Sequence, residues 1–154
     1  MPWQMYLGKA GELASRSEFL IHGYNVAVPD VDVGEDIFIV ENASGRVWRV
    51  QVRTTFGKRK RYGFSARVFV SLKQLNATFR PPLVYVFAIR KDVGQWEFVI
   101  VPQTVLFAEY ETHGIGSVHG DRLWLYFAFK ETELWCGARN WQGYRNQLLL
   151  PVLD

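Results

Sequence analysis

The chain has 154 residues, of which 49% are hydrophobic and 16% aromatic, a composition that excludes a disordered tail and suits one folded domain. The formal net charge is +3, and the lone Cys136 excludes both a disulfide framework and a cysteine metal knuckle. Because no apolar run approaches the roughly 20 residues that span a bilayer and the first residues do not resemble a signal peptide, we expect a cytoplasmic domain over residues 1–154, with no membrane partner.

The N-terminal part predicts one helix followed by two short strands. Residues 8–22 predict the helix, because small and apolar side chains share one face at helical spacing: Ala10, Leu13, Ala14, Ser17, Leu20 and Ile21. Gly23 is a suitable residue to end it. Residues 24–28 predict a short strand closed by Pro29, and residues 37–40 predict a buried strand because they are apolar and β-branched.

The clearest strand pattern covers residues 47–53, after a hairpin turn at residues 42–45. Trp48, Val50 and Val52 alternate with a second set that would face the other side of the sheet, namely Val47, Arg49, Gln51 and Arg53. The first set predicts a core face. The second is an unusually polar row for a strand in the middle of a domain.

The remaining elements alternate between strands and short helices. Strands are predicted over residues 62–70, 83–89, 96–101 and 123–129, and helices over residues 72–79, capped by Ser71, and 103–111. Residues 58–61 are expected to form a basic loop, and residues 133–148 are ambiguous, with a helix as one option. A helix followed by a β-meander, then further helices and strands, predicts an α/β sheet with helices on its faces.

The charges are distributed very unevenly along the chain. Between Asn42 and Lys91 there are twelve Lys and Arg residues and no Asp or Glu, so this segment carries +12 and the rest of the chain carries −9. Such asymmetry favours a polyanionic partner, above all a nucleic acid. The alternative is a protein-interaction domain with a solvated basic face.

Three oxygen-bearing side chains from separate predicted elements are candidates for binding a divalent cation: Glu12, Asp36 and Gln51. Asp36 and Gln51 lie on strands joined by a tight hairpin, and the first helix must pack on the same sheet. Two carboxylates and an amide oxygen suit Mg²⁺, which takes oxygen ligands and assists phosphodiester hydrolysis. Each residue also has a simpler interpretation: Glu12 could pair with Arg16, Asp36 could be a turn residue, and Gln51 could face solvent.

These residues occur in "GKAGELA", "GYNVAVPDVDVGEDIFIV" and "WRVQVRTT", and their order resembles the PD-(D/E)XK nuclease superfamily over about residues 8–101. Holliday-junction-resolvase-like and intron-encoded homing endonucleases are the similar members. The resemblance implies a restriction-endonuclease-like central mixed β-sheet flanked by helices. It also implies a Mg²⁺-dependent endodeoxyribonuclease, with Mn²⁺ as a substitute metal and Glu12, Asp36 and Gln51 as metal ligands. We prefer Asp36 to Asp30 because Asp36 directly precedes the buried strand.

Arg53 occupies the position of the motif lysine, and Gln51 replaces the commoner acid. A guanidinium stays protonated and is a poor base, although its fork of donors can bind a phosphate. Catalysis through Glu12, Asp36, Gln51 and Arg53 is therefore one interpretation. The other is a catalytically inactive nuclease fold that binds nucleic acid or a protein partner.

The basic segment then predicts the surface that contacts DNA, through phosphate contacts by Arg49, Lys58, Arg59, Lys60, Arg61 and Arg67. The interleaved aromatic residues Phe56, Tyr62 and Phe64 are expected mainly in the core. Cutting both strands of a duplex is naturally done by two active sites, so a homo-oligomer, either a dimer or a tetramer, is expected.

Overall fold

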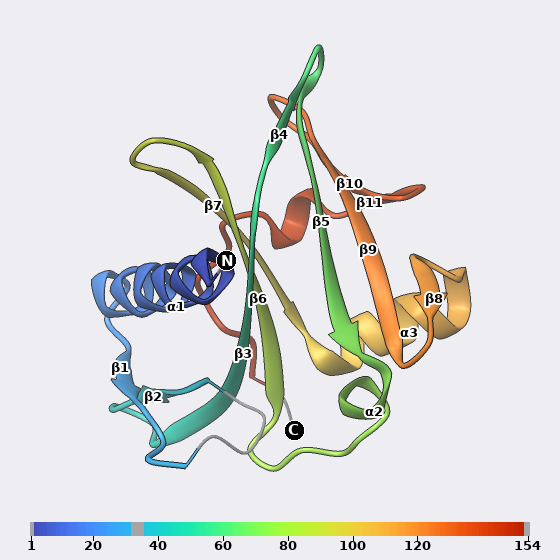
Figure 1. Ribbon diagram of the computed structural model, residues 1–154. Coiled ribbons are helices and arrows are strands. Elements are labelled where there is room, and N and C mark those ends of the chain that lie inside the picture. Colours follow the sequence, from blue (N-terminus) through green and yellow to red (C-terminus); the bar gives the residue numbers. More distant parts are fainter. Residues whose placement is uncertain (1, 32–35, 153–154) are drawn as a thin grey trace.

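Two β-sheets and three α-helices make up the part of the protein that the computed structural model describes, residues 2–31 and 36–152 (Figure 1). The first sheet has the strand order β1-β2-β3-β6-β7, formed by Asn25–Ala27, Ile37–Glu41, Arg46–Phe56, Leu83–Asp92 and Gln95–Pro102. Within it, β3 and β6 are parallel and the other neighbours are antiparallel. The sheet is therefore mixed, as predicted.

The second sheet is antiparallel and has the order β11-β10-β9-β5-β4, formed by Arg139–Asn140, Leu134–Cys136, Arg122–Phe129, Gly63–Ser71 and Lys58–Lys60. A short strand, β8 (Ser117–His119), pairs with β9. The helices are α1 (Trp3–Ile21), α2 (Leu72–Leu75) and α3 (Gln103–His113), and a 3₁₀ turn, η1, covers Gln142–Tyr144. The predicted α/β class with flanking helices is confirmed, but its strands are divided between two sheets.

The two sheets are connected by one nearly continuous stretch of chain. β3 pairs with β6 as far as Phe56, and after Gly57 the chain continues as β4, which pairs with β5. In Figure 1 the β4–β5 hairpin projects beyond the body of the protein. A side chain at Gly57 would lie 2.8 Å from the Phe64 ring, so the crossing from one sheet to the other requires glycine.

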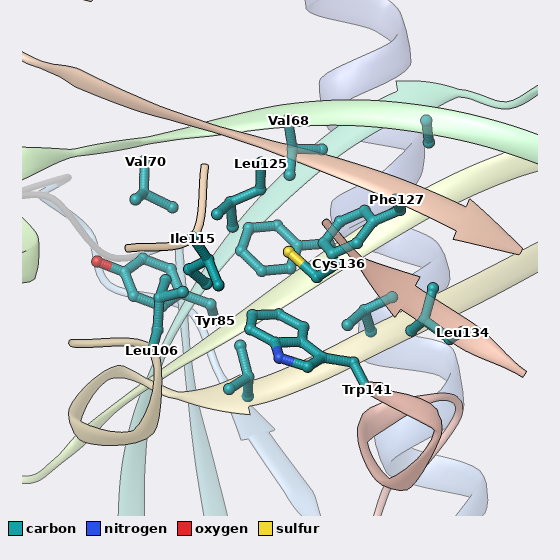
Figure 2. Close-up of a cluster of buried hydrophobic side chains, with 14 of the residues drawn as sticks. Val68, Val70, Tyr85, Leu106, Ile115, Leu125, Phe127, Leu134, Cys136 and Trp141 are labelled. Atoms are coloured by element: carbon teal, nitrogen blue, oxygen red, sulfur yellow. The ribbon is translucent and has the colours of Figure 1, made fainter. Parts of the chain in front are cut away.

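Hydrophobic side chains form two cores, one on each face of the first sheet. Trp48, Val50 and Val52 of β3 are buried with Phe19 of α1, so the predicted core face of this strand is confirmed. The other core fills the space between the sheets. Figure 2 shows side chains from β5, β6, α3 and the C-terminal segment meeting there, among them Val68, Tyr85, Leu106 and Trp141.

The face of α1 that lies against the sheet is not the predicted one. Its buried residues are Gly11, Ser15 and Phe19, whereas Leu13, Leu20 and Ile21 of the predicted face are exposed. A Cβ at Gly11 would lie only 2.0 Å from Thr54 Oγ1, and Ser15 Oγ donates to the Gly11 carbonyl at 2.7 Å. Small residues thus let α1 approach β3 closely.

Three other local predictions are wrong in their details. The segment expected as a basic loop is β4, an exposed strand paired with β5. The ambiguous residues 133–148 form β10, β11 and η1 instead of a helix. The helix predicted over residues 72–79 ends at Leu75, although Ser71 does cap it, its Oγ accepting from Gln74 N at 3.2 Å.

The outcome for the interleaved aromatic residues is mixed. Phe64 is 4% exposed and belongs to the core, but Phe56 and Tyr62 are 52% and 44% exposed. No helix in the described ranges is long and apolar enough to cross a membrane.

Candidate functional site

Asp36 and Gln51 lie in direct contact where β3 extends past β2. The last residue pair between these strands joins Ile37 and Val50, and Asp36 N donates to the Val50 carbonyl at 3.0 Å. Asp36 Oδ2 then accepts from Val52 N at 2.8 Å and from Gln51 Nε2 at 2.9 Å. The carboxylate takes the place that a further β2 residue would have in the ladder, so the backbone of β3 fixes its position.

Gln51 connects this carboxylate to α2. Its side chain is 8% exposed, and its Oε1 accepts from Gln74 Nε2 at 3.2 Å. α2 is held in turn by Gln103, whose Nε2 donates to the carbonyls of Leu75 at 2.8 Å and Ala77 at 2.6 Å. No sequence motif singles out Gln74, because its contact with Gln51 depends on how α2 folds back onto β3.

The donor set at Asp36 and Gln51 fits a hard cation. The Gln51 amide now presents its nitrogen to Asp36, and the opposite orientation would place its oxygen against the carboxylate. That orientation gives up the hydrogen bond from Gln74 Nε2, and it lets the two oxygens share a cation such as Mg²⁺, which takes such ligands together with water. Among the described residues, no group of three His, Cys, Asp or Glu side chains gathers around a common point.

Glu12 has partners within its own helix. Its carboxylate pairs with Arg16, four residues along, and with Lys9 Nζ at 3.5 Å. Its neighbour Gly11 contacts Thr54, so this turn of α1 lies against the C-terminal half of β3. The structure thus joins Asp36 to Gln51 and places Glu12 on an adjacent element, paired with two cations.

Arg53 lies two residues beyond Gln51 and stacks on an aromatic ring. Its guanidinium carbon is 4.7 Å from the centroid of the Phe69 ring. Burial lowers the pKa of Arg53, and the charge of Arg122 acts in the same direction, whereas Asp36 and Tyr85 raise it. Within the described part of the chain, Arg53 Nε has no hydrogen-bond partner.

An open groove of about 500 Å³ runs between the start of α1, the end of β3 and the second sheet. We call it the arginine–aromatic groove; its lining includes Trp3, Arg53, Phe56, Arg67, Phe69 and Trp124. The guanidinium carbon of Arg67 lies 5.2 Å from the centroid of the Trp124 ring. The ring centroids of Phe69 and Trp124 are 5.1 Å apart. Basic and aromatic side chains are therefore combined on one concave surface.

Strand alternation explains why these side chains share a surface. On β5, Val68 and Val70 point into the core, so Arg67 and Phe69 point away from it. On β9, Leu123 and Leu125 are buried, which leaves Arg122 and Trp124 on the outer side. Sequence reasoning missed Phe69, Arg122 and Trp124; alternation in β5 could have flagged Phe69, but the pairing of β5 with β9 was not foreseen.

The predicted DNA-binding residues fall in three places. Arg67 lies in the arginine–aromatic groove, and Lys58 pairs in register with Ser65, which puts it on the same face of the second sheet as Arg67. Lys60 and Arg61 are exposed along the hairpin, and Arg59 is paired with Asp92 at 2.6 Å. Arg49 lies elsewhere on β3, where its Nη2 donates to the Arg80 carbonyl at 2.9 Å.

Neither a known protein-family model nor a curated protein matches this sequence. The fold, however, is similar to that of a solved bacterial homing endonuclease, I-Ssp6803I, with a TM-score of 0.52 and 16% sequence identity. The likeness covers 91% of this chain and 85% of that one. At this level of identity the likeness concerns the fold, and the protein thus has a nuclease-like α/β fold.

Proposed function

We propose that this protein is a Mg²⁺-dependent endodeoxyribonuclease of the PD-(D/E)XK type. The observation that carries the proposal is the contact of Asp36 with Gln51 at the start of β2. Arg53, two residues beyond Gln51, presents its guanidinium to a basic groove. A carboxylate, an amide and a cation at such spacing suit a phosphodiester bound beside a metal ion. The similarity to a homing endonuclease fold supports the same proposal.

Each residue has a definite role in this proposal. Asp36 would hold the metal with a carboxylate that the Val52 N–H keeps in place, and Gln51 would be a ligand through its amide oxygen. Glu12 is the proposed third ligand and would exchange its contact with Arg16 for the metal. Arg53 binds the phosphate and neutralises charge that develops on it. The bound Mg²⁺ would polarise the phosphate and lower the pKa of an attacking water.

The direct test is cleavage of supercoiled plasmid and four-way-junction DNA by pure protein with Mg²⁺, Mn²⁺ or EDTA. We expect nicked and linear products with either metal and none with EDTA. Isothermal titration with Mn²⁺ alone gives a second measurement, with binding expected in the absence of DNA. If neither cleavage nor Mn²⁺ binding is found with either DNA, the protein is not a metal-dependent nuclease.

The second candidate function is binding of nucleic acid without cleavage. The observation that favours it is Arg53, because a guanidinium remains protonated at neutral pH and cannot act as the base that a lysine can become. Binding of the same DNA by a protein that does not cut it with either metal would select this alternative.

Binding of DNA is expected to depend on the exposed charges of the β4–β5 hairpin. Replacing Lys58, Lys60 and Arg61 together by Gln should lower the slope of log affinity against log salt by about two to three, since each phosphate contact contributes about 0.9. Fluorescence anisotropy of a labelled duplex from 50 to 200 mM salt, about the range over which phosphate contacts are lost, measures this slope.

The matched control is Arg46→Gln, which removes one charge at the other end of β3 and should leave the slope nearly unchanged. Weak binding that is insensitive to salt would instead favour a protein-interaction domain with a solvated basic face.

The expected homo-oligomer remains a proposal, and the outer side of α1 supports it. Exposed residues recur there at alternating spacings of four and three, as in a coiled-coil seam: Tyr6, Ala10, Leu13, Ser17 and Leu20. An antiparallel pair centred between Ala10 and Leu13 would set Leu13 against the second copy's Ala10 and Tyr6 against the second copy's Ser17. Large residues would thus meet small ones in the two pairs nearest the two-fold axis.

This pairing predicts the effect of a single charge. Leu13 is 49% exposed, so Leu13→Glu should leave the fold intact while it converts a dimer into a monomer. Sedimentation equilibrium of both proteins at micromolar concentration measures the change. Val93→Glu is the control, because Val93 is 96% exposed in the β6–β7 turn. A wild-type monomer, or a Leu13→Glu dimer, would contradict the proposed interface.

A further inference from the structure

Phe69 is contacted by two guanidinium groups from different strands. The guanidinium carbon of Arg53, on β3, lies 4.7 Å from the ring centroid, and that of Arg122, on β9, lies 4.1 Å from it. Each contact is favourable by itself as a cation–π interaction. Both guanidinium groups are therefore held against the same ring.

Within the described residues this arginine pair lacks a contacting carboxylate, although the charge of Asp36 raises the pKa of Arg53. Neither Arg53 nor Arg122 forms an ion pair with a carboxylate in the described ranges, and the buried Arg53 Nε has no hydrogen-bond partner there. Burial is the larger cause of the lowered pKa of Arg53, and the like charge of Arg122 acts in the same direction, as repulsion between two cations does. An anion bound between them would remove this repulsion.

The groove adds further positive potential. Trp3 and Gln4, at the N-terminus of α1, line it together with Arg53 and Arg67. The first turn of α1 contains no acidic residue, so its N-terminal dipole is not offset there. The ligand that suits these groups is an oxyanion with several acceptor oxygens.

We propose that Arg53 and Arg122 together bind one phosphate group of the DNA backbone, with Phe69 as the positioning residue that holds both guanidinium groups. The proposal rests on the proposed function and deepens it, because it assigns a phosphate contact to Arg122. This residue lies on β9, which carries none of the proposed metal ligands. It also accounts for an arginine at position 53. A planar guanidinium stacks on a ring while its forked donors bind phosphate, and an ammonium does not do both.

Two arginines that share one phosphate should not act independently. In the presence of EDTA, which prevents cleavage, we expect Arg53→Gln and Arg122→Gln each to weaken binding of a fluorescent 20-base-pair duplex about tenfold, as loss of a charged contact does. The double variant should lose clearly less than the product of the two single effects, because either substitution alone disrupts the shared contact.

The controls separate this contact from general charge and from folding. Arg46→Gln removes the same charge at the other end of β3 and should change affinity less than about twofold. Phe69→Leu keeps both charges but removes the ring, and it should weaken binding without lowering the salt slope. Thermal unfolding of each variant identifies any loss of affinity that comes from loss of fold.

Either of two results overturns the proposal: wild-type affinity in Arg122→Gln, or a double-variant loss equal to the product of the single losses. The second result would mean that the arginines bind separate phosphates. Because binding is measured without metal, a failure of the nuclease proposal appears only in the cleavage assay and leaves this test unaffected.

Discussion

Asp36→Asn is expected to lower single-turnover cleavage of DNA with Mg²⁺ by at least about a hundredfold, because it removes the charge that holds the metal. The substituted amide keeps an oxygen that can accept from Val52 N, so the ladder position of residue 36 survives. Binding of DNA in EDTA should be unchanged or stronger, since one negative charge is lost beside the phosphate. Cleavage rates and anisotropy measured on the same preparation separate the two effects.

The matched control is Asp121→Asn, an exposed acid in the turn before β9 that is outside the proposed metal site. Cleavage by this variant should equal that of the wild type. If Asp36→Asn still cuts at the wild-type rate, Asp36 is not a metal ligand and the proposed site is wrong. If the wild type binds DNA but never cuts it, the inactive alternative gains support.

Gly11→Ala is expected to destabilise the protein by about 1–3 kcal/mol, although alanine is the better helix former. The added Cβ would lie 2.0 Å from Thr54 Oγ1 and 2.8 Å from Thr54 Cβ, so α1 must move away from β3. Urea unfolding measures the loss. Because the movement also displaces Glu12, cleavage should fall in the same variant.

Gly8→Ala is the control within the same helix. No atom lies within 4 Å of a Cβ at Gly8, so only helix propensity acts and stability should rise by about 0.5–1 kcal/mol. Opposite signs at two glycines three residues apart would confirm that close packing sets the position of α1. A gain in stability at both positions would show that α1 is not held tightly against Thr54.

The part of the site that depends on neighbouring segments could be predicted from the sequence. The hairpin between β2 and β3 brings Asp36 to Gln51, and alternation in β3 separates Trp48 and Val50 from Gln51. Both relations involve residues close in the chain, where turn length and strand period determine the geometry. The Ser71 cap was predictable for the same reason.

The remainder depends on contacts between distant segments and on close packing. The predicted face of α1 follows from the spacing of its apolar residues, whereas Gly11 and Ser15 lie against the sheet because small residues permit close approach. The pairing of β5 with β9 joins residues such as Phe69 and Trp124, and no local pattern specifies such a partner. The arginine–aromatic groove depends on that pairing, so it could not be seen in the sequence.

One stretch of chain passes from the first sheet, as β3, into the second sheet, as β4. The backbone therefore sets the width of the arginine–aromatic groove. Arg53 lies before Gly57 on β3, and Phe69 belongs to the sheet that the chain enters after it. A change in the angle between the sheets must alter the separation between these two residues. A nucleic acid bound in the groove would therefore change the angle between the sheets. The groove would adjust its width to the ligand in this way, without a separate hinged lid.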